Sequence, residues 1–429
     1  MRKILAMILL PLAVAVLKKY QPLVIAVAGT VGKTSTKNAI AAALGKTKIV
    51  RASEKNNNTE IGSAVTVLGA SAAGKNVLGW LRVFWQGLVL LAAKDKSYPA
   101  ILVLEFGEQR PGDLARLAGL FPPRIVVLTA IGATHGEFLG GIKGIEREFE
   151  TLIKLIPADG AAVLNSDDSA VIALALCAKA KVVKYGLAEG AAVRGIEPHP
   201  LIRRDEKRAL FVDGMAFKIE FDGNVIPVQI PGALGLPPVF AALAACAVSA
   251  ALALNPMVAI EGLRDFKASK GRLRVLDGIK FSSLIDDSYN ASTGSMIEAL
   301  RALRSVPLDE GESRIAVLGE MREMGAASEA EHRRVGASVV EFEVDRLVTV
   351  GEMARDILRG ALEAGFPKER GVHFAAALEA GRFVQGILER GDTVLIKGSR
   401  GAHLERITRE LMAEPLRAEE LLEFGEPTT

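Results

Sequence analysis

Residues 24–36 read Val-Ile-Ala-Val-Ala-Gly-Thr-Val-Gly-Lys-Thr-Ser-Thr, and this stretch decides the class of fold. Its first five residues are apolar and are followed by glycine, which is typical of a strand buried on both faces of a parallel sheet. A helix is predicted from Lys33 to Leu44, directly after the second glycine. A strand, a glycine-rich turn and a helix in this order predict a loop whose backbone N–H groups bind phosphate.

The predicted phosphate-binding loop has the form Gly-Thr-x-Gly-Lys-Thr, with Val27 at the position where the general motif has a further glycine. Lys33 is placed to reach the β- and γ-phosphates, and the Thr34 hydroxyl is placed to bind Mg²⁺. The sequence therefore predicts ATP and Mg²⁺ as cofactors. The residues assigned to the nucleotide are Gly29, Thr30, Gly32, Lys33, Thr34 and Ser35.

Two further residues are expected near this loop. Buried strands are predicted at 101–105 and 125–129, and the carboxyl ends of parallel strands share the sheet edge where open α/β folds bind ligands. Glu105 ends the first of these strands, where a carboxylate is costly unless it is paired or bound to metal. His135 follows the second. We predict that both serve the site; a structural salt bridge is the alternative role for Glu105.

The order of predicted elements gives an α/β fold class with two domains. Strands alternate with helices, which indicates a mostly parallel sheet in a central P-loop ATPase domain over residues 21–267. Within it, residues 192–231 predict antiparallel strands around Asp222-Gly223, and an Ala-rich helix from Val239 is expected to stop at Asn255-Pro256. After a basic, hinge-like stretch the alternation restarts, which predicts a C-terminal Rossmann-like α/β domain over 268–429.

Composition excludes several classes of protein. Half of the 429 residues are apolar and 24% are charged, so the chain is not globally disordered. A net charge of +3 gives no electrostatic case for nucleic acid as a partner. Two cysteines are too few for a disulfide framework or a cysteine-built metal site.

Residues 1–20 are predicted to form an apolar N-terminal helix, with an apolar run at 4–17 between basic residues that is interrupted by Pro11. The run is shorter than the roughly 20 residues that cross a bilayer. Three interpretations stay open: a signal peptide with Ala13-Val14-Ala15 as a cleavage site, a helix in peripheral contact with the inner membrane face, or an ordinary docked helix. Because the next segment uses ATP, we expect the protein in the cytoplasm.

The motifs together resemble those of the Mur ligases, and within that family the type that adds D-alanyl-D-alanine to a cell-wall peptide. The resemblance runs from about residue 22 to 412. Besides the phosphate loop, it is carried by Asn58-Thr59-Glu60-Ile61-Gly62, Leu104-Glu105-Phe106-Gly107, Pro111-Gly112-Asp113, the segment ending in His135, Gly271-Arg272, Asp286-Asp287-Ser288-Tyr289-Asn290-Ala291, Ala316-Val317-Leu318-Gly319-Glu320-Met321, the segment Glu329 to Gly336 with His332, and Lys397-Gly398-Ser399-Arg400-Gly401.

The resemblance implies an ADP-forming acid–amino-acid ligase of peptidoglycan synthesis, and thus a role in cell shape and division. ATP would phosphorylate a carboxylate, and an amine such as D-Ala-D-Ala would attack the acyl phosphate. Lys33, Glu105 and His135 would carry catalysis, with Thr34 and Glu105 on one Mg²⁺ and His135 on a second. Arg272 would contact phosphates and Asp287 the ribose. The substrate contacts implied are Asn58, Thr59, Tyr289, Asn290, Lys397, Ser399 and Arg400.

Four features depart from the family's pattern. Only about 22 residues precede the first strand, too few for the domain that binds the UDP-sugar. Phe149 occupies the position of a lysine whose carbamate helps to hold the second Mg²⁺. Residues 236–241 lack the polar groups expected at adenine, and Ser292-Thr293 replaces Asn-Pro.

These departures leave two alternatives to a ligase that adds D-Ala-D-Ala to a cell-wall peptide precursor. The first is a Mur-like ligase acting on a membrane-linked or different peptide acceptor. The second is a nucleotide-binding pseudoenzyme or scaffold, for which Phe149 is the main argument. Lys33, Thr34, Glu105 and His135 argue against the second alternative.

Overall fold

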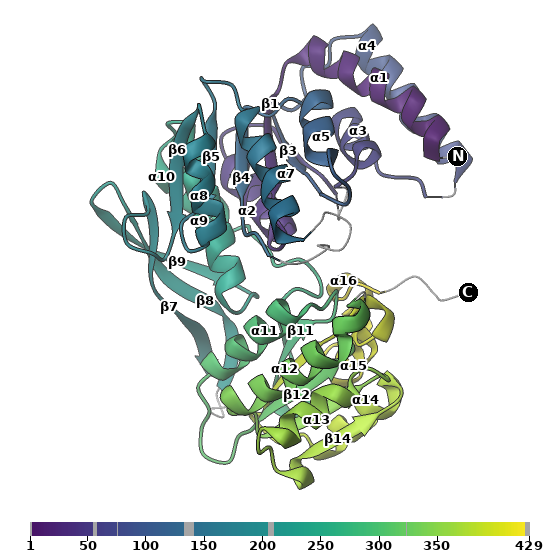
Figure 1. The fold of residues 1–429 in the computed structure, drawn as a ribbon, viewed down its shortest axis with the longest axis vertical. Coiled ribbons are helices and arrows are strands. Elements are labelled where there is room, and N and C mark those ends of the chain that lie inside the picture. The colour runs from purple at the N-terminus through teal and green to yellow at the C-terminus, as the bar shows by residue number, and fades with distance from the viewer. Residues whose placement is uncertain are drawn as a thin grey trace. The chain divides into compact units, whose positions relative to one another are not determined.

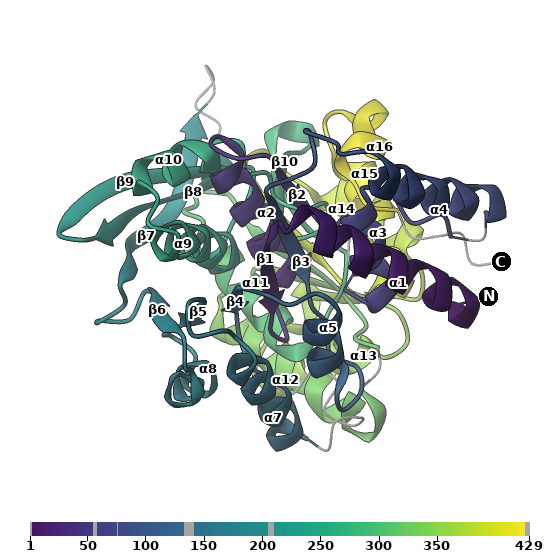
Figure 2. The same ribbon diagram turned by 90° about the horizontal axis from the view of Figure 1, so that it is seen from above.

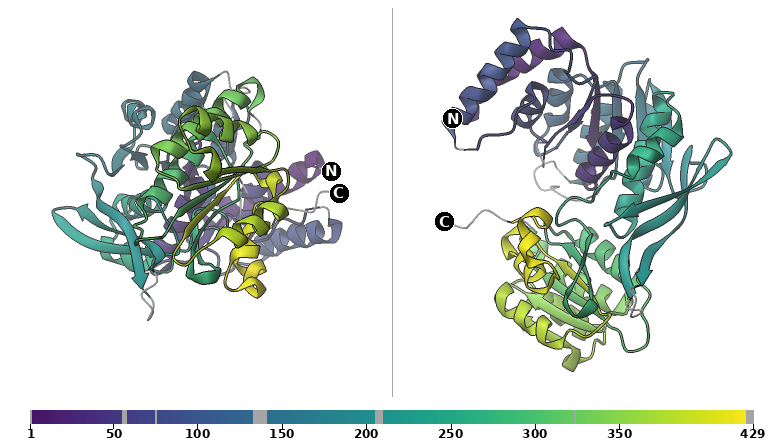
Figure 3. Two further views of the ribbon diagram at one scale, coloured as in Figure 1. Left: turned by 90° about the horizontal axis from the view of Figure 1, so that it is seen from below. Right: turned by 180° about the vertical axis from the view of Figure 1, so that it is seen from behind.

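The computed structural model describes residues 2–54, 58–74, 76–132, 141–204, 210–322 and 324–424. These residues belong to two compact units, which the ribbon views in Figures 1 and 3 show from several sides. The first unit consists of Met1–Glu197, Lys218–Val228 and Val239–Phe266, and the second of Pro198–Phe217, Gln229–Pro238 and Lys267–Thr429.

The first unit is built on a parallel sheet with the strand order β2-β3-β1-β4-β5-β6, continued by β7, β8 and β9. β1 pairs with β3 on one side and with β4 on the other. The strand order therefore reverses at β1, the position where open α/β sheets bind ligands. The strands are β1 (Leu23–Ala28), β2 (Val50–Ala52), β3 (Ile101–Glu105), β4 (Ile125–Leu128), β5 (Ala161–Asn165), β6 (Lys181–Gly186), β7 (Val193–Arg204), β8 (Leu210–Phe221) and β9 (Asn224–Pro231).

Helices cover both faces of this sheet (Figure 2). Val24, Ala26 and Ala28 of β1 belong to a hydrophobic core shared with α1, α3, α5 and α7, whereas α2 packs against β1, β2 and β3 and contacts α10. The helices are α1 (Arg2–Tyr20), α2 (Lys33–Gly45), α3 (Glu60–Leu68), α4 (Val77–Ala92), α5 (Asp113–Leu120), α7 (Ile142–Lys154), α8 (Ser169–Ala173), α9 (Leu236–Ala251) and α10 (Pro256–Leu263), with the short 3-10 turn η1 (Leu174–Cys177).

Two local predictions for residues 192–266 have different outcomes. The predicted hairpin is confirmed: Asp222 and Gly223 join β8 to β9 with φ values of 48° and 73°, as a two-residue hairpin turn requires. The predicted Ala-rich helix does stop before Asn255-Pro256, but α9 spans Leu236–Ala251 and ends earlier than the predicted Leu254. Asn255 also begins α10, because its side chain accepts a hydrogen bond from Met257 N and Pro256 suits the first helical position.

The N-terminal helix α1 is docked on the first unit. Leu9, Ala13 and Val16 are at most 1% exposed and belong to its core. The Lys19 ammonium donates to the carbonyls of Leu90, Leu91 and Ala93, which lie at the C-terminus of α4. Within the described parts of the chain, no helix is both long and apolar enough to cross a membrane.

The second unit contains a six-stranded sheet with the order β10-β11-β15-β12-β13-β14. β10 is antiparallel to β11 and the other pairs are parallel, so the predicted α/β class holds for both units. α14, α15 and α16 pack on one face in a hydrophobic core with β11, β12, β13 and β15. The strands are β10 (Arg274–Asp277), β11 (Ser283–Asp287), β12 (Arg314–Gly319), β13 (Arg346–Val350), β14 (Gly371–Phe374) and β15 (Thr393–Lys397).

The helices of the second unit complete an α/β layer on each side of its sheet. α11 contacts β15 and β12, and α13 contacts β13 and β14. The helices are α11 (Thr293–Ser305), α12 (Ser328–Glu341), α13 (Arg355–Glu363), α14 (Ala377–Ile387), α15 (Glu405–Leu411) and α16 (Ala418–Leu421). Short 3-10 turns are η2 (Ile279–Phe281), η3 (Gly325–Ala327), η4 (Lys368–Arg370), η5 (Arg400–Ala402) and η6 (Pro415–Arg417).

Candidate functional site

The phosphate loop runs from the end of β1 to the start of α2 and is braced by the end of β4. Thr30 N donates to Ala130 O at 2.9 Å, and Thr129 Oγ1 donates to Val31 O at 2.5 Å. Gly29 has φ = 131°, and a Cβ there would lie 2.2 Å from Thr129 Oγ1. Only glycine fits this position without displacing the loop. Gly32, with φ = 82°, directly precedes α2. The first backbone N–H groups of a helix have no partner within the helix and can bind an anion such as phosphate.

Lys33 and Thr34 follow this loop, and the structure brings them together with Glu105. Thr34 Oγ1 donates to Glu105 Oε2 at 3.0 Å, and both residues are buried. The Lys33 ammonium folds back onto the loop and donates to the carbonyl of Gly29. β3 delivers Glu105 to this position because it pairs directly with β1 in parallel register. A hydroxyl, a carboxylate and an ammonium thus lie beside the helix N-terminus.

A second carboxylate, Glu108, lies against Lys33 and was not predicted from the sequence. Its Oε1 is 3.9 Å from Lys33 Nζ, and its side chain is 1% exposed. Burial raises the pKa of Glu108, the charge of Lys33 opposes this rise, and the charges of Glu105 and Glu148 add to it. Glu148 on α7 accepts a hydrogen bond from Gly112 N at 2.7 Å. Lys33 therefore has a buried carboxylate beside it that the sequence motif did not indicate.

The segment after β4 is held by side chains from β5 and the turn that follows. Asn165 Nδ2 donates to Thr129 O at 2.8 Å, and Asp168 Oδ2 accepts from Ile131 N at 2.9 Å. Both residues were missed in the sequence, although polar residues at the end of the apolar run 161–164 and just after it were a usable signal. His135, predicted to bind metal, lies outside the described residues.

The structure places the predicted substrate contacts Asn58 and Thr59 at the start of α3. Gly107 N donates to Asn58 O at 3.1 Å, which ties this turn to the end of β3. The Thr59 hydroxyl accepts from Gly62 N at 3.3 Å and so caps α3. Asn58 therefore lies next to the Glu105 strand end, whereas the described contacts of Thr59 are those of a helix cap.

In the second unit, Asp287 and Lys397 form a buried ion pair at the carboxyl edge of the sheet. Lys397 Nζ donates to Asp287 Oδ2 at 2.7 Å and to Asn290 O at 2.9 Å, with the two charged side chains 2% and 11% exposed. The parallel register of β11 and β15 sets Asp287 opposite Lys397. Asp287 Oδ1 also accepts from Leu273 N at 3.2 Å, so it orders the chain that follows Arg272.

The ring of Tyr289 contacts both arginines that were predicted to bind substrate or nucleotide in the second unit. The guanidinium carbon of Arg272 lies 4.5 Å from the centre of the Tyr289 ring, and that of Arg400 lies 5.3 Å from it. Gly271 has φ = 66°, and a Cβ there would lie 2.9 Å from Tyr289 N, so glycine permits this approach. Two cations beside one aromatic ring form a positively charged surface suited to phosphate or carboxylate.

Ser399 belongs to a network that joins the ends of β12 and β15. Its Oγ accepts from Arg322 N at 2.9 Å, and its N donates to Glu320 O at 3.0 Å. His332 is fully buried, and its Nε2 accepts from Met321 N at 2.9 Å. The family motif around His332 therefore supports the loop after β12 structurally.

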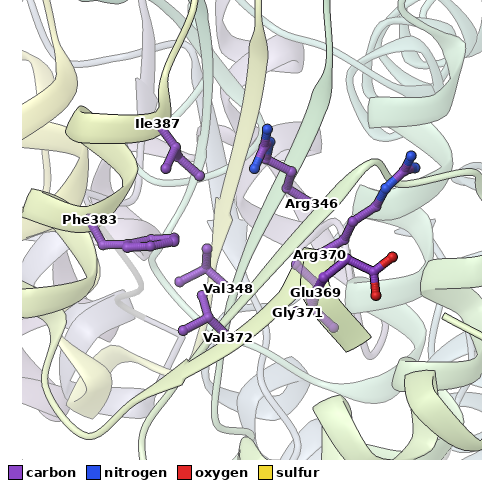
Figure 4. Close-up of a pocket in the computed structure, with 9 residues that line it drawn as sticks. Arg346, Val348, Glu369, Arg370, Gly371, Val372, Phe383 and Ile387 are labelled. Atoms are coloured by element: carbon purple, nitrogen blue, oxygen red, sulfur yellow. The ribbon is translucent and has the colours of Figure 1, made fainter. Parts of the chain in front are cut away.

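A small pocket in the second unit contains none of the predicted site residues (Figure 4). Val348, Val372 and Phe383 line its apolar side, and Arg346 and Arg370 lie opposite. Its volume of about 30 Å³ suits only a water molecule or two. The candidate functional residues lie instead at the carboxyl edge of the sheet in each unit, described separately above.

The residues of the first edge fit Mg²⁺ in their donor chemistry. Mg²⁺ prefers hard oxygen ligands and usually binds one or two carboxylates together with phosphate oxygens and water. Thr34, Glu105 and Glu108 offer such oxygens from buried positions. Over the described parts of the chain no three His, Cys, Asp or Glu side chains form a ready metal cage.

The fold and the site define a class of protein: a phosphate-loop enzyme that uses ATP, with a second α/β unit carrying basic residues at its sheet edge. Comparison with known proteins then gives the family. Residues 27–248 match the Mur ligase middle domain, and residues 271–400 match the Mur ligase, glutamate ligase domain. The chain belongs to the Mur ligase family and is an ATP-dependent, ADP-forming ligase.

Curated relatives agree on this family, and a solved structure shares the fold. The chain is 30% identical over 405 residues to the UDP-N-acetylmuramoyl-tripeptide–D-alanyl-D-alanine ligase of Bacillus subtilis, covering 94% of this chain and 79% of the relative. It is 27% identical to the enzyme of the same name from Escherichia coli, over 90% and 76% of the two chains. The fold superposes on MurF ligase of Thermotoga maritima in complex with ADP with a TM-score of 0.75, at 23% identity, covering 97% and 84%.

Proposed function

We propose that this ligase joins D-alanyl-D-alanine, or a similar amine, to the carboxylate of a cell-wall peptide precursor. The observation that carries the proposal is the Thr34–Glu105 contact of 3.0 Å beside Lys33, in a chain 30% identical over nearly its whole length to a D-alanyl-D-alanine ligase. ATP phosphorylates the acceptor carboxylate, and ADP is released. The amine then attacks the acyl carbon, the C–O bond to phosphate breaks, and an amide and inorganic phosphate result.

The first unit supplies the phosphate chemistry. Lys33 leaves the Gly29 carbonyl for the γ-phosphate, and the N–H groups at the start of α2 hold the β-phosphate. Thr34 and Glu105 would hold one Mg²⁺, and His135 would help to hold a second. When bound, Mg²⁺ neutralises charge that develops on the transferred phosphoryl group. Asn58 contacts the acceptor peptide from the neighbouring strand end, next to the capping residue Thr59.

The second unit supplies nucleotide and amine contacts. Arg272 contacts phosphate and Asp287 the ribose, while Arg400, Ser399, Tyr289 and Asn290 contact the carboxylate end of the amine substrate. Two of the three Lys397 protons are used by Asp287 and Asn290. Lys397 therefore contributes mainly by holding Asp287, with one proton left for substrate.

A phosphate-release assay with ATP, D-Ala-D-Ala and two acceptors separates the alternatives. UDP-N-acetylmuramoyl-tripeptide tests the proposal, and the same tripeptide on a lipid carrier tests a membrane-linked acceptor. Phosphate release with the first acceptor, and its loss in Lys33→Ala, is the expected result. Release only with the lipid-linked acceptor favours the other substrate, and ATP binding without release under any condition favours a pseudoenzyme.

We also propose that this cytoplasmic enzyme contacts the membrane surface, through a patch wider than residues 4–17. α1 and α4 lie side by side, and neither contains an acidic residue (Figures 1 and 2). Exposed basic residues lie on or just after these helices, namely Lys18, Arg82, Lys94 and Lys96, with one exposed acid, Asp95, among them. Apolar side chains 37–77% exposed cover the pair: Ile4, Met7, Ile8, Val77, Leu78, Leu81, Trp85, Leu88 and Val89. Such a surface suits anionic lipid headgroups over an apolar interior.

Vesicle flotation tests the membrane contact. Phosphatidylglycerol vesicles should carry the wild-type chain upward, and phosphatidylcholine vesicles should carry less. Trp85→Glu and Leu78→Glu should each lower binding at least tenfold, whereas Leu416→Glu, at a fully exposed position elsewhere, should not change it. Equal binding by all variants, or self-association through the patch in light scattering, would contradict the contact.

A further inference from the structure

Glu108, beside Lys33 of the phosphate loop, and Glu148 on α7 both have buried carboxylate oxygens without a hydrogen-bond partner. Both carboxylate oxygens of Glu108 and the Oε2 atom of Glu148 are buried and unpartnered among the described residues. The second Glu148 oxygen is fixed by Gly112 N at 2.7 Å, which leaves Oε2 with a defined position. A buried carboxylate without a partner is costly, so these oxygens indicate a cation that the protein atoms alone do not supply.

The charge balance around Glu108 points in the same direction. Glu105 and Glu148 lie close enough for their charges to act on Glu108, and the cation that offsets them is Lys33. Lys33 Nζ is 3.9 Å from Glu108 Oε1, beyond hydrogen-bond distance. When Lys33 turns to the γ-phosphate, as the proposed function requires, this ion pair is lost while the incoming nucleotide adds further negative charge. A divalent cation restores the balance.

Phe149, the residue next to Glu148 on α7, cannot restore this charge balance. Phe149 is fully buried in the hydrophobic core of the first unit. It therefore supplies neither a carbamate nor any other charge to the site. Glu148, one position earlier, points its carboxylate to the loop before α5, and Glu150 forms an ion pair with Lys154 instead. The acids on this helix are Glu146, Glu148 and Glu150, and Glu148 is the one whose charge acts on Glu108.

We propose that Glu108 and Glu148 bind a second Mg²⁺, with nucleotide phosphate oxygens and water completing its coordination. The proposal rests on the proposed function, because the nucleotide supplies part of the site. Two protein carboxylates with phosphate and water match the way Mg²⁺ is bound in nucleotide sites. The sequence change at Phe149 and the acid at Glu108 are then two parts of one rearranged metal site.

Binding of Mn²⁺, used in place of Mg²⁺, tests this site directly. Electron paramagnetic resonance counts free Mn²⁺ in the presence of the full chain and the non-hydrolysable nucleotide AMP-PNP. Wild type should bind two Mn²⁺ per chain. Glu108→Gln and Glu148→Gln should each weaken one of them at least tenfold and leave the other unchanged. Glu150→Gln, on the same helix, is the matched control and should behave as wild type.

Two results would overturn the proposal. The first is a wild-type chain that binds a single Mn²⁺, or Gln variants that keep two with unchanged affinities. The second is a Glu108→Gln variant that binds AMP-PNP more tightly without metal while its Mn²⁺ count stays at two, since Glu108 is then only the resting partner of Lys33. Because Gln removes a buried charge, folding should be retained. Amide formation is measured in parallel: normal Mn²⁺ binding without product would contradict the ligase assignment and leave this site standing.

Discussion

Removing Lys397 should destabilise the second unit far more than removing one member of an exposed ion pair with the same N–O distance. Lys397 and Asp287 are 2.7 Å apart with side chains 2% and 11% exposed. At an effective dielectric constant of 20 their attraction is about 6 kcal/mol, most of which offsets the cost of burying both charges. Lys397→Met leaves Asp287 buried without its cation, which costs about 3–5 kcal/mol.

A double-mutant cycle with Asp287→Asn measures this pair without the confounding cost of each single change. We expect a coupling free energy of about 3 kcal/mol from urea denaturation of the four proteins, with the double variant more stable than Lys397→Met alone. The matched control is Arg333–Glu329, also 2.7 Å apart but 38% and 63% exposed, for which about 0.5 kcal/mol is expected. A coupling below 1 kcal/mol at Asp287–Lys397 would refute the reasoning from burial.

Three further changes test other parts of the structure. Gly29→Ala should weaken binding of an ATP analogue at least tenfold in calorimetry, because its Cβ meets a hydroxyl oxygen at 2.2 Å, while Gly45→Ala, which has open space, should not. Val16→Asp should lower the unfolding free energy by about 3–5 kcal/mol, and Met7→Asp, at a 77% exposed position, by less than about 0.5 kcal/mol. Burial raises the pKa of Asp286 to about 6, above its unfolded value near 3.9, so this carboxyl adds stability below pH 4 that is lost as the pH rises through 6. Asp286→Asn should therefore match wild type at pH 4 and be more stable at pH 8, by up to roughly 3 kcal/mol; equal stability at both pH values would contradict the burial effect.

Much of the fold was predictable because buried parallel strands are continuous apolar runs. The runs at 24–28, 101–105 and 125–129 all proved to be strands of the first sheet. β2 and β14 were missed because each is a short edge strand of half-buried residues without such a run. The stop assigned to Asn255-Pro256 held, but the start of a new helix there was missed, since the same dipeptide that cannot continue a helix also begins one well.

The site was predictable where its residues form a local motif. Lys33 and Thr34 follow a glycine turn, and Glu105 ends a recognisable strand, so their shared edge followed from the sheet alone. Glu108 carried no signal, because its importance depends on burial beside Lys33. The pairing of Asp287 with Lys397 depends on β11 lying next to β15, a neighbour relation between strands more than 100 residues apart that no local pattern encodes.

The central claim is that ATP activates the acceptor as an acyl phosphate on this chain, and oxygen transfer tests it most directly. UDP-N-acetylmuramoyl-tripeptide with ¹⁸O in its terminal carboxylate is incubated with the chain, ATP, Mg²⁺ and D-Ala-D-Ala, and the released phosphate is analysed by mass spectrometry. One carboxylate oxygen bonds to phosphorus and leaves with it when the amine attacks the acyl carbon. We predict one ¹⁸O atom in each phosphate and none from Lys33→Ala. Amide formation with unlabelled phosphate, or phosphate release without amide, would contradict the account.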